Sequence, residues 1–289
     1  MQNYLQPEDD GLLMLSSGNW AAIKLDYLAR YIDIFETAMR NKWAIRNYID
    51  LLAGPGKNRV RNSKTILLGS PLLALTTPHP FTGFYFADKS PKYMETLKQR
   101  CTHSPLYNRV DIRIGDSNEL VNEIVAHLKR DDKHSLNLAF LDPYGLELQW
   151  TTVAKLASLR RMDLIIHYSQ MGFNRYMRTA YKSDSQTAVD LFFGNENWRD
   201  VFAKWQNKPG LHRELINLYK TQLKDLGYTE VFRGDEDVGD EPLIRNQLRN
   251  VPLYRLLFAS KHNLGHKFWR EVVRRDIYGQ GRLFDLYTK

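Results

Sequence analysis

Four aspartates close short strand-like runs of the sequence, three of them apolar and one alternating. They are Asp50, Asp88, Asp116 and Asp142. The first of them is followed by a glycine turn that contains Gly54 and Gly56. In a parallel sheet the carboxyl ends of the strands meet at one edge, and ligands bind there. Carboxylates at that edge can accept hydrogen bonds from hydroxyl and amino groups, while glycines let the backbone approach a ligand closely. The spacing therefore predicts a ligand pocket at this edge.

The segments around these aspartates alternate between strand-like and helix-like patterns. The strand-like runs are residues 45–50, 84–88, 110–116, 136–142 and 162–168. Between them lie helix-length segments, such as residues 91–100 and 120–130, with apolar residues near helical spacing. This alternation predicts an α/β fold with a parallel sheet and helices on both faces. Residues 228–232 and 253–260 supply a sixth and a seventh strand, and we expect these two to pair antiparallel.

The sequence predicts one large domain over residues 19–289, preceded by a weakly ordered leader over residues 1–18. Residues 20–39 have the spacing of a long amphipathic helix. Residues 57–64 predict a polar, basic loop after the glycine turn. Residues from about 169 to 210 lack a strand pattern and contain several aromatics, so we expect a helical insertion after the fifth strand.

The chain is basic, with a formal net charge of +8 and a pI near 9.4. Basic residues interleave with aromatics in residues 173–182, 261–270 and 274–278. Such clusters suit nucleic acid, because cations contact phosphates and aromatic faces stack unpaired bases. The alternative for each cluster is an amphipathic helix with a solvated basic face. A single cysteine, Cys101, excludes an intramolecular disulfide and a cysteine-rich zinc site.

No apolar run approaches the roughly 20 residues that cross a bilayer. The amino terminus also lacks the pattern of a secretory signal. We therefore expect a cytoplasmic protein. The histidines show no metal-ligand spacing, so we expect no metal site.

The order of Asp50, Gly54 and Gly56 resembles motif I of class I S-adenosylmethionine-dependent methyltransferases. The resemblance implies that Asp50 lies near the methionine amino group or orders the loop, while the glycine backbone frames the cofactor. Asp88 would accept the ribose hydroxyls. Asp116 would accept a hydrogen bond from the adenine amine, with capping of the following helix as its alternative role. The implied fold is a Rossmann-like class I methyltransferase sheet of about seven strands.

A second motif, Asp142-Pro143-Tyr144-Gly145, resembles the Asp/Asn-Pro-Pro-Tyr/Phe motif of amino-methyltransferases. In that motif a side-chain oxygen and a proline carbonyl grip an exocyclic amine, and an aromatic ring stacks on the flipped base. This chain has Tyr144 where the second proline stands and Gly145 where the aromatic stands. The resemblance makes Asp142, Pro143 and Tyr144 the expected catalytic residues. The alternative is an ordinary turn between a strand and a helix.

Several short motifs together resemble the three-Cys-motif partner proteins of bacteria and phages. The matching residues are Trp20 and Lys24, residues 28–31, 48–56, 69–71 and 140–145, and residues 258–269, which contain Ser260-Lys261-His262. The resemblance implies a methyltransferase-like fold and a partner protein, encoded nearby, that carries a cysteine motif. The role of Ser260-Lys261-His262 does not follow from the sequence.

Three functions are consistent with these patterns. The first is S-adenosylmethionine-dependent methyl transfer to DNA or RNA, with a base amine as acceptor. The second is a module that binds nucleic acid or a partner and keeps the cofactor fold without catalysis. The third is methyl transfer to a protein or a small molecule, with the basic charge incidental.

Overall fold

The main sheet of the structure has seven strands. The computed structural model describes residues 4–229, 231, 241–246 and 249–274. In sheet order the strands are β6 (Val110–Ile114), β5 (Gly83–Asp88), β2 (Ile45–Asp50), β7 (Ser135–Leu141), β8 (Met162–Tyr168), β10 (Val251–Ala259) and β9 (Leu243–Asn246). The first five are parallel, and β10 runs antiparallel to both of its neighbours. The expected α/β, Rossmann-like class I methyltransferase fold is therefore confirmed.

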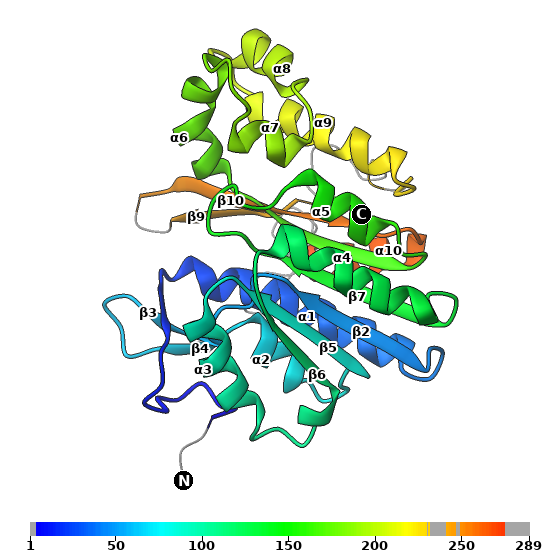
Figure 1. Cartoon of the computed structure of the whole chain (residues 1–289). Coiled ribbons are helices and arrows are strands. Elements are labelled where there is room, and N and C mark those ends of the chain that lie inside the picture. Colours follow the sequence, from blue (N-terminus) through cyan, green and yellow to red (C-terminus); the bar gives the residue numbers. More distant parts are fainter. Residues whose placement is uncertain (1–3, 230, 232–240, 247–248, 275–289) are drawn as a thin grey trace, which may run out of the picture.

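Helices cover both faces of this sheet (Figure 1). One face packs against α1 (Trp20–Met39), α2 (Ser70–Leu75), α3 (Pro91–Cys101) and α10 (Asn263–Arg274). The other packs against α4 (Ser117–Leu128) and α5 (Trp150–Ala157). Strands β7 and β8 are buried along almost their whole length, because they lie at the centre of the sheet with both faces covered. None of the helices in the described ranges has the length and apolar character needed to span a membrane.

Residues 170–225, which follow β8, form a helical layer at the top of Figure 1. It consists of α6 (Gln170–Tyr181), α7 (Ala188–Phe193), α8 (Trp198–Trp205) and α9 (Leu211–Asp225). Aromatic packing joins this layer to the sheet, since Phe173 and Phe192 both contact the ring of Tyr168 at the end of β8. The indole of Trp198 donates to Asp190, which also pairs with Arg199. The layer is thus continuous with the core.

The expected weakly ordered leader is wrong for the residues that the structure describes, 4–18. Strand β1 (Leu15–Ser17) pairs with β3 (Lys57–Val60), which pairs with β4 (Ile66–Leu68) in a separate small sheet. The carboxylate of Asp10 bonds Arg100 through two nitrogens at 2.8 Å each and lies 2.9 Å from the ammonium of Lys57. A buried two-cation contact of this kind fixes the leader to the domain.

The expected basic loop at residues 57–64 is wrong for residues 57–60, which are strand β3 of a hairpin, and is confirmed for the turn at residues 61–64. Residues 57–60 are mostly polar and carry no local pattern typical of a strand. They are extended because they pair with β1 and β4.

The sixth strand lies elsewhere than the sequence predicts. Of residues 228–232, the described ones are not in a strand, and β9 at Leu243–Asn246 occupies that place in the sheet. Tyr228 is buried because it packs into the core just after Gly227 ends α9, not because it pairs in a ladder. The seventh strand, expected at residues 253–260, is confirmed as β10. The end of the last helix, expected near residue 278, lies outside the described residues.

Candidate cofactor and acceptor site

The glycine turn after β2 is held by two carboxylates from neighbouring strand ends. Asp50 accepts hydrogen bonds from the amide of Leu52 and, at 2.5 Å, from the hydroxyl of Ser70. Asp88 accepts the amide of Gly54 at 3.1 Å. Gly54 has φ +60° and Gly56 has φ +92°, conformations that side chains other than glycine rarely adopt. Asp50 and Asp88 therefore order one turn at the carboxyl edge of the sheet.

The turn does not lead directly into a helix. The β3–β4 hairpin intervenes, and the chain then returns so that the amide of Gly69 donates to the carbonyl of Gly56 at 2.7 Å. Helix α2 begins at the next residue, with Pro71 in its first turn. The Gly69-Ser70-Pro71 segment thus restores the strand–turn–helix connection that the hairpin interrupts.

Asp50 is fully buried and is not among the residues that line the cavity beside the glycine turn. Burial raises the pKa of its carboxyl to about 7, and the hydrogen bond from Ser70 acts in the opposite direction. Of its two expected roles, contact with the cofactor and ordering of the loop, the geometry favours the second. Asp50 is therefore a positioning residue.

The raised pKa of Asp50 predicts a specific pH dependence of stability. Its folded-state pKa, about 7, lies above the ordinary value of 3.8, so the wild type loses stability from this group as the pH rises from 4 to 7. Asp50→Asn does not titrate and should gain stability relative to wild type over this range. Urea unfolding at pH 5 and pH 8 measures that gain, with Glu147→Gln as an exposed control. If the difference in unfolding free energy between Asp50→Asn and wild type were the same at both pH values, the prediction would be contradicted.

Asp88 and Asp116 follow neighbouring strands at the same edge. Asp88 is nearly buried, and its second oxygen accepts the amide of Ser90 at 2.9 Å. A carboxylate has about four acceptor positions, so two remain for ribose hydroxyls. Asp116 caps α4 by accepting the amide of Asn118 at 2.8 Å, and its side chain is exposed. Capping leaves its second oxygen available, so both of its expected roles remain compatible.

A cavity of about 260 Å³ opens beside the glycine turn. Four of the eight expected site residues line it: Gly56, Asp142, Pro143 and Tyr144. The other four, Asp50, Gly54, Asp88 and Asp116, lie behind it or along the edge outside it. The leader, helix α1 and the β3–β4 hairpin supply much of the remaining wall.

Two groups of the expected acceptor motif, the carboxylate of Asp142 and the carbonyl of Pro143, already accept hydrogen bonds from within the chain. The ammonium of Lys24 lies 2.5 and 2.7 Å from the two oxygens of Asp142. The ring of His167 bonds the carbonyl of Pro143 through Nδ1 at 3.0 Å. Tyr144 is 69% exposed, so its ring is free to receive a ligand face. An incoming amine must therefore share Asp142 with Lys24 or displace it, and must likewise share or displace the histidine bond to Pro143.

His167 is a site residue for which the sequence favoured a structural role. Burial lowers its pKa to about 4, so the ring is neutral and Nδ1 carries the proton that Pro143 accepts. Its Nε2 is buried with no partner among the described residues. The ring stands edge-on to Tyr254 at 4.3 Å, and Lys24 lies 5.3 Å from the same tyrosine ring. The one signal in the sequence is the place of His167 at the end of the fifth strand.

The residues at this edge suit S-adenosylmethionine in their chemistry. Of the two glycines of the turn, Gly56 lines the cavity, whereas a side chain at Gly54 would meet Leu15 at 3.0 Å. Asp88 and Asp116 offer acceptors for an adenosine, and the cavity wall contains the cations Lys24 and Arg61 for a carboxylate. The described residues contain no cluster of side chains that could hold a metal ion.

No family model matches the sequence, and no curated protein matches it either. Solved structures match at low identity and low TM-score. The geranyl diphosphate methyltransferase in complex with S-adenosylmethionine shares 8% identity over 81% of this chain and 85% of its own, with a TM-score of 0.36. A methyltransferase from Geobacter sulfurreducens with S-adenosylhomocysteine shares 12% over 80% and 89%, with a TM-score of 0.34. The human methyltransferase 10 domain containing protein shares 11% over 55% and 70%, with a TM-score of 0.35. The functional argument therefore depends on the strand order and the site geometry of this chain.

Proposed function

We propose that the protein transfers a methyl group from S-adenosylmethionine to an exocyclic base amine of nucleic acid. The observation that carries the proposal is the position of the Asp142-Pro143 acceptor pair. It lines the same cavity as Gly56 of the glycine turn, at the edge where Asp88 and Asp116 end their strands. The proposal thus places the methyl donor next to the acceptor pair, with Gly56 as the expected cofactor residue that lines the shared cavity.

The cofactor would be held by the glycine turn and the two carboxylates beyond it. Asp88 and Asp116 would accept from its ribose and adenine, and Gly54 and Gly56 would frame it. When bound, the cofactor supplies an electrophilic methyl group on a sulfonium. Asp50 would act only through the turn that it orders.

The acceptor amine would be oriented by Asp142 and the carbonyl of Pro143. Hydrogen bonds that both oxygens accept from the amine leave the lone pair of the amine facing the cofactor. Asp142 is also a carboxylate placed to take up the proton that the methylated amine releases. Lys24 would hold Asp142 in place until the substrate arrives. Such a reaction depends mainly on positioning, which contributes through effective concentration.

Helix α6 and the β3–β4 hairpin give the mouth of the cavity a basic and aromatic border. Both lie on the left side of the molecule in Figure 1, and residues of both line the cavity. On α6, Tyr176 is 48% exposed, with Arg175 and Arg178 exposed beside it. On the hairpin, the exposed Arg61 also stacks over Trp20. Cations with exposed aromatic faces suit an unpaired strand of nucleic acid.

Removing the two α6 arginines tests this border. Arg175→Ala with Arg178→Ala should reduce the dependence of single-strand binding on salt, because each lost phosphate contact lowers the slope of log K against log salt by about 0.7. The double variant Arg109→Ala with Lys224→Ala removes the same charge from exposed positions outside the border. Fluorescence anisotropy from 50 to 300 mM salt gives both slopes. Equal slopes for the two double variants would exclude α6 from the interface.

The proposed reaction is tested by tritiated methyl transfer onto DNA, tRNA and rRNA, with protein and small-molecule extracts as further acceptors. We expect label in a nucleic acid, and digestion to nucleosides should place it on a base amine. Label only in protein or in small molecules would contradict the choice of acceptor.

A second candidate is favoured by one observation, the ion pair between Lys24 and Asp142. If that pair is permanent, the acceptor groups are closed, and the chain is a binding module that keeps the fold. Such a module fits the proposal of a cysteine-motif partner protein. In that case nucleic acid or partner binding persists, no acceptor becomes labelled, and Asp142→Ala lowers stability because it breaks the ion pair with Lys24.

A further inference from the structure

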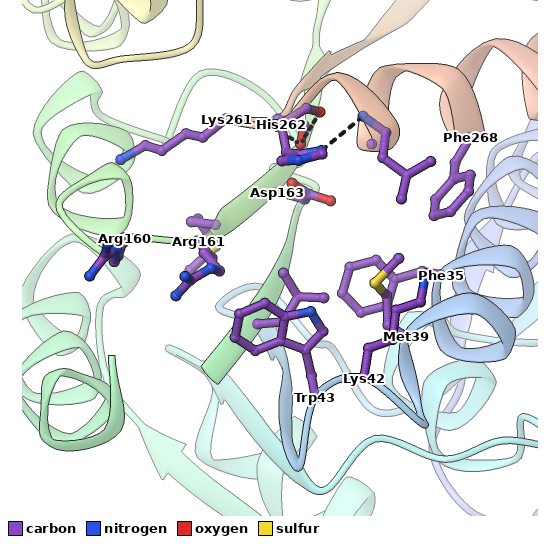
Figure 2. A pocket seen from close by; sticks show the side chains of 15 residues that line it. Phe35, Met39, Lys42, Trp43, Arg160, Arg161, Asp163, Lys261, His262 and Phe268 are labelled. Carbon is purple, nitrogen blue, oxygen red and sulfur yellow. Dashed lines mark hydrogen bonds between the residues drawn. The ribbon is translucent and has the colours of Figure 1, made fainter. Parts of the chain in front are cut away.

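A second and larger cavity, of about 400 Å³, lies at the opposite edge of the sheet (Figure 2). It is bounded by the end of α1, the starts of β7 and β8, and the corner where β10 passes into α10. This is the amino-terminal edge of the parallel strands, whereas the candidate methyl-transfer site lies at their carboxyl edge. The cavity therefore has no part in the function proposed above.

The Ser260-Lys261-His262 segment forms the upper corner of this cavity, and its role there is structural. The amine of Lys261 donates to the carbonyls of Ala157 and Leu159. The ring of His262 accepts the amide of Leu264 at 3.1 Å in the first turn of α10. A side chain at Gly265 would meet the hydroxyl of Ser260 at 2.3 Å, so glycine permits the close approach of helix and strand. The side chains of Lys261 and His262 are thus engaged within the chain, and we expect other residues of the cavity to contact a ligand.

The floor of the cavity is apolar and rich in flat rings. Phe35, Trp43 and Phe268 contribute rings, and Met39 and Met162 fill the space between strand and helix. Figure 2 shows Trp43 and Phe35 on the side of the cavity opposite the corner. Flat apolar walls favour a flat, aromatic ligand, because ring faces stack on one another.

Cations stand at the rim. Arg160 and Lys42 are exposed, and neither side chain has a hydrogen bond or an ion pair among the described residues. Arg161 stacks on Trp43 at 4.3 Å and donates to the carbonyl of Lys133. Figure 2 draws Arg160 beside Arg161, with Lys42 on the other side of Trp43. The unengaged guanidinium of Arg160 therefore fits a phosphate group on the ligand.

One carboxylate faces the open middle of the cavity. Asp163 is only 7% exposed, and it accepts the hydroxyl of Tyr31 at 2.7 Å. Burial raises its pKa to about 6, while hydrogen bonds from Ser260 and Tyr31 act the other way, so the group is an acceptor at neutral pH. A carboxylate in an otherwise apolar wall disfavours a fatty acid, which brings a second negative charge and no donor to match it. It favours a ring that carries an amine.

We propose that this cavity binds a nucleotide whose base carries an exocyclic amine, with the base stacked on the aromatic floor, its amine on Asp163 and its phosphate on Arg160. The nucleotide is either free or part of an unpaired strand, since the contacts involve one base and one phosphate. A strand bound here would continue along the basic surface around Lys42 and Arg160.

Calorimetry with AMP, IMP and adenosine tests each contact separately. Saturating S-adenosylhomocysteine is present throughout, so that adenine cannot report on the cofactor site. Wild type should bind AMP about tenfold more tightly than IMP, which carries a carbonyl in place of the amine. Asp163→Asn can donate to that carbonyl, so its preference should move toward IMP. Arg160→Ala should bring the affinities of AMP and adenosine within about twofold of each other.

Arg109→Ala, an exposed arginine at the far edge of the sheet, is the matched control and should bind like wild type. A ten-residue oligo(dA) tells the two sources apart: tighter binding than AMP indicates a strand, and weaker binding a free nucleotide. Thermal unfolding checks that Asp163→Asn folds, and if it does not, Arg160→Ala decides alone. Absence of AMP and oligo(dA) binding, or AMP binding that neither variant changes, overturns the proposal. The binding of S-adenosylhomocysteine itself reports separately on the methyl-transfer site.

Discussion

Replacing Asp142 by alanine should lower methyl transfer on the order of 100-fold, because the acceptor loses the oxygen that orients it. Binding of S-adenosylmethionine should change little, since no cofactor contact is assigned to this side chain. Initial rates of tritium transfer and calorimetry with the cofactor measure the two effects on the same preparations.

Two further variants sharpen this prediction. Asp142→Asn keeps an oxygen acceptor and should retain part of the activity. Glu147→Ala removes a carboxylate of the same loop, which bonds the amide of Gly145, and should leave the rate within a few-fold of wild type. An Asp142→Ala enzyme with the wild-type rate would exclude this residue from the acceptor site. Loss of cofactor binding in that variant would instead show that Asp142 belongs to the cofactor-binding part of the site.

Replacing Asp10 by alanine should destabilise the fold by about 3–5 kcal/mol, because Arg100 and Lys57 would lose a shared counter-ion while remaining buried. The two cations hold the pKa of Asp10 well below its ordinary value, and this outweighs the effect of burial. The stability that depends on this depressed pKa is present above the ordinary pKa and is lost as the pH falls below it. Urea unfolding at pH 7 measures the cost of the substitution.

Asp9→Ala provides the matched control. Asp9 pairs with Arg59 at an exposed position one residue away, so its removal should leave the unfolding midpoint nearly unchanged. If Asp10→Ala unfolds at the same urea concentration as Asp9→Ala, the leader is not fixed to the domain by this network.

The sheet could be predicted from the sequence because its central strands carry their own signal. The run ending in Asp142 is mostly apolar, and a strand buried on both faces needs that composition wherever it lies in the chain. The glycine turn is readable for a similar reason, since a left-handed backbone at Gly54 and Gly56 nearly requires glycine.

The features that the sequence did not predict depend on contacts between distant segments of the chain. Strand β1 is three residues long and exists through its pairing with β3, about 40 residues away. Lys24 lies on a helix 118 residues before Asp142, and nothing in its local pattern indicates the ion pair. His167 ends a buried strand, where a structural histidine and a site residue look alike in sequence. Tertiary pairing decides such cases, and local propensity does not.

Titration of S-adenosylmethionine into the wild-type protein and into Asp88→Ala tests the central claim most directly. The account predicts one binding site per chain in the wild type and at least about tenfold weaker binding in Asp88→Ala, which loses a buried hydrogen-bond acceptor of both the ribose and the glycine turn. If wild type gave no heat of binding with either S-adenosylmethionine or S-adenosylhomocysteine, the account would be contradicted. Equal affinity of the two proteins would contradict it as well.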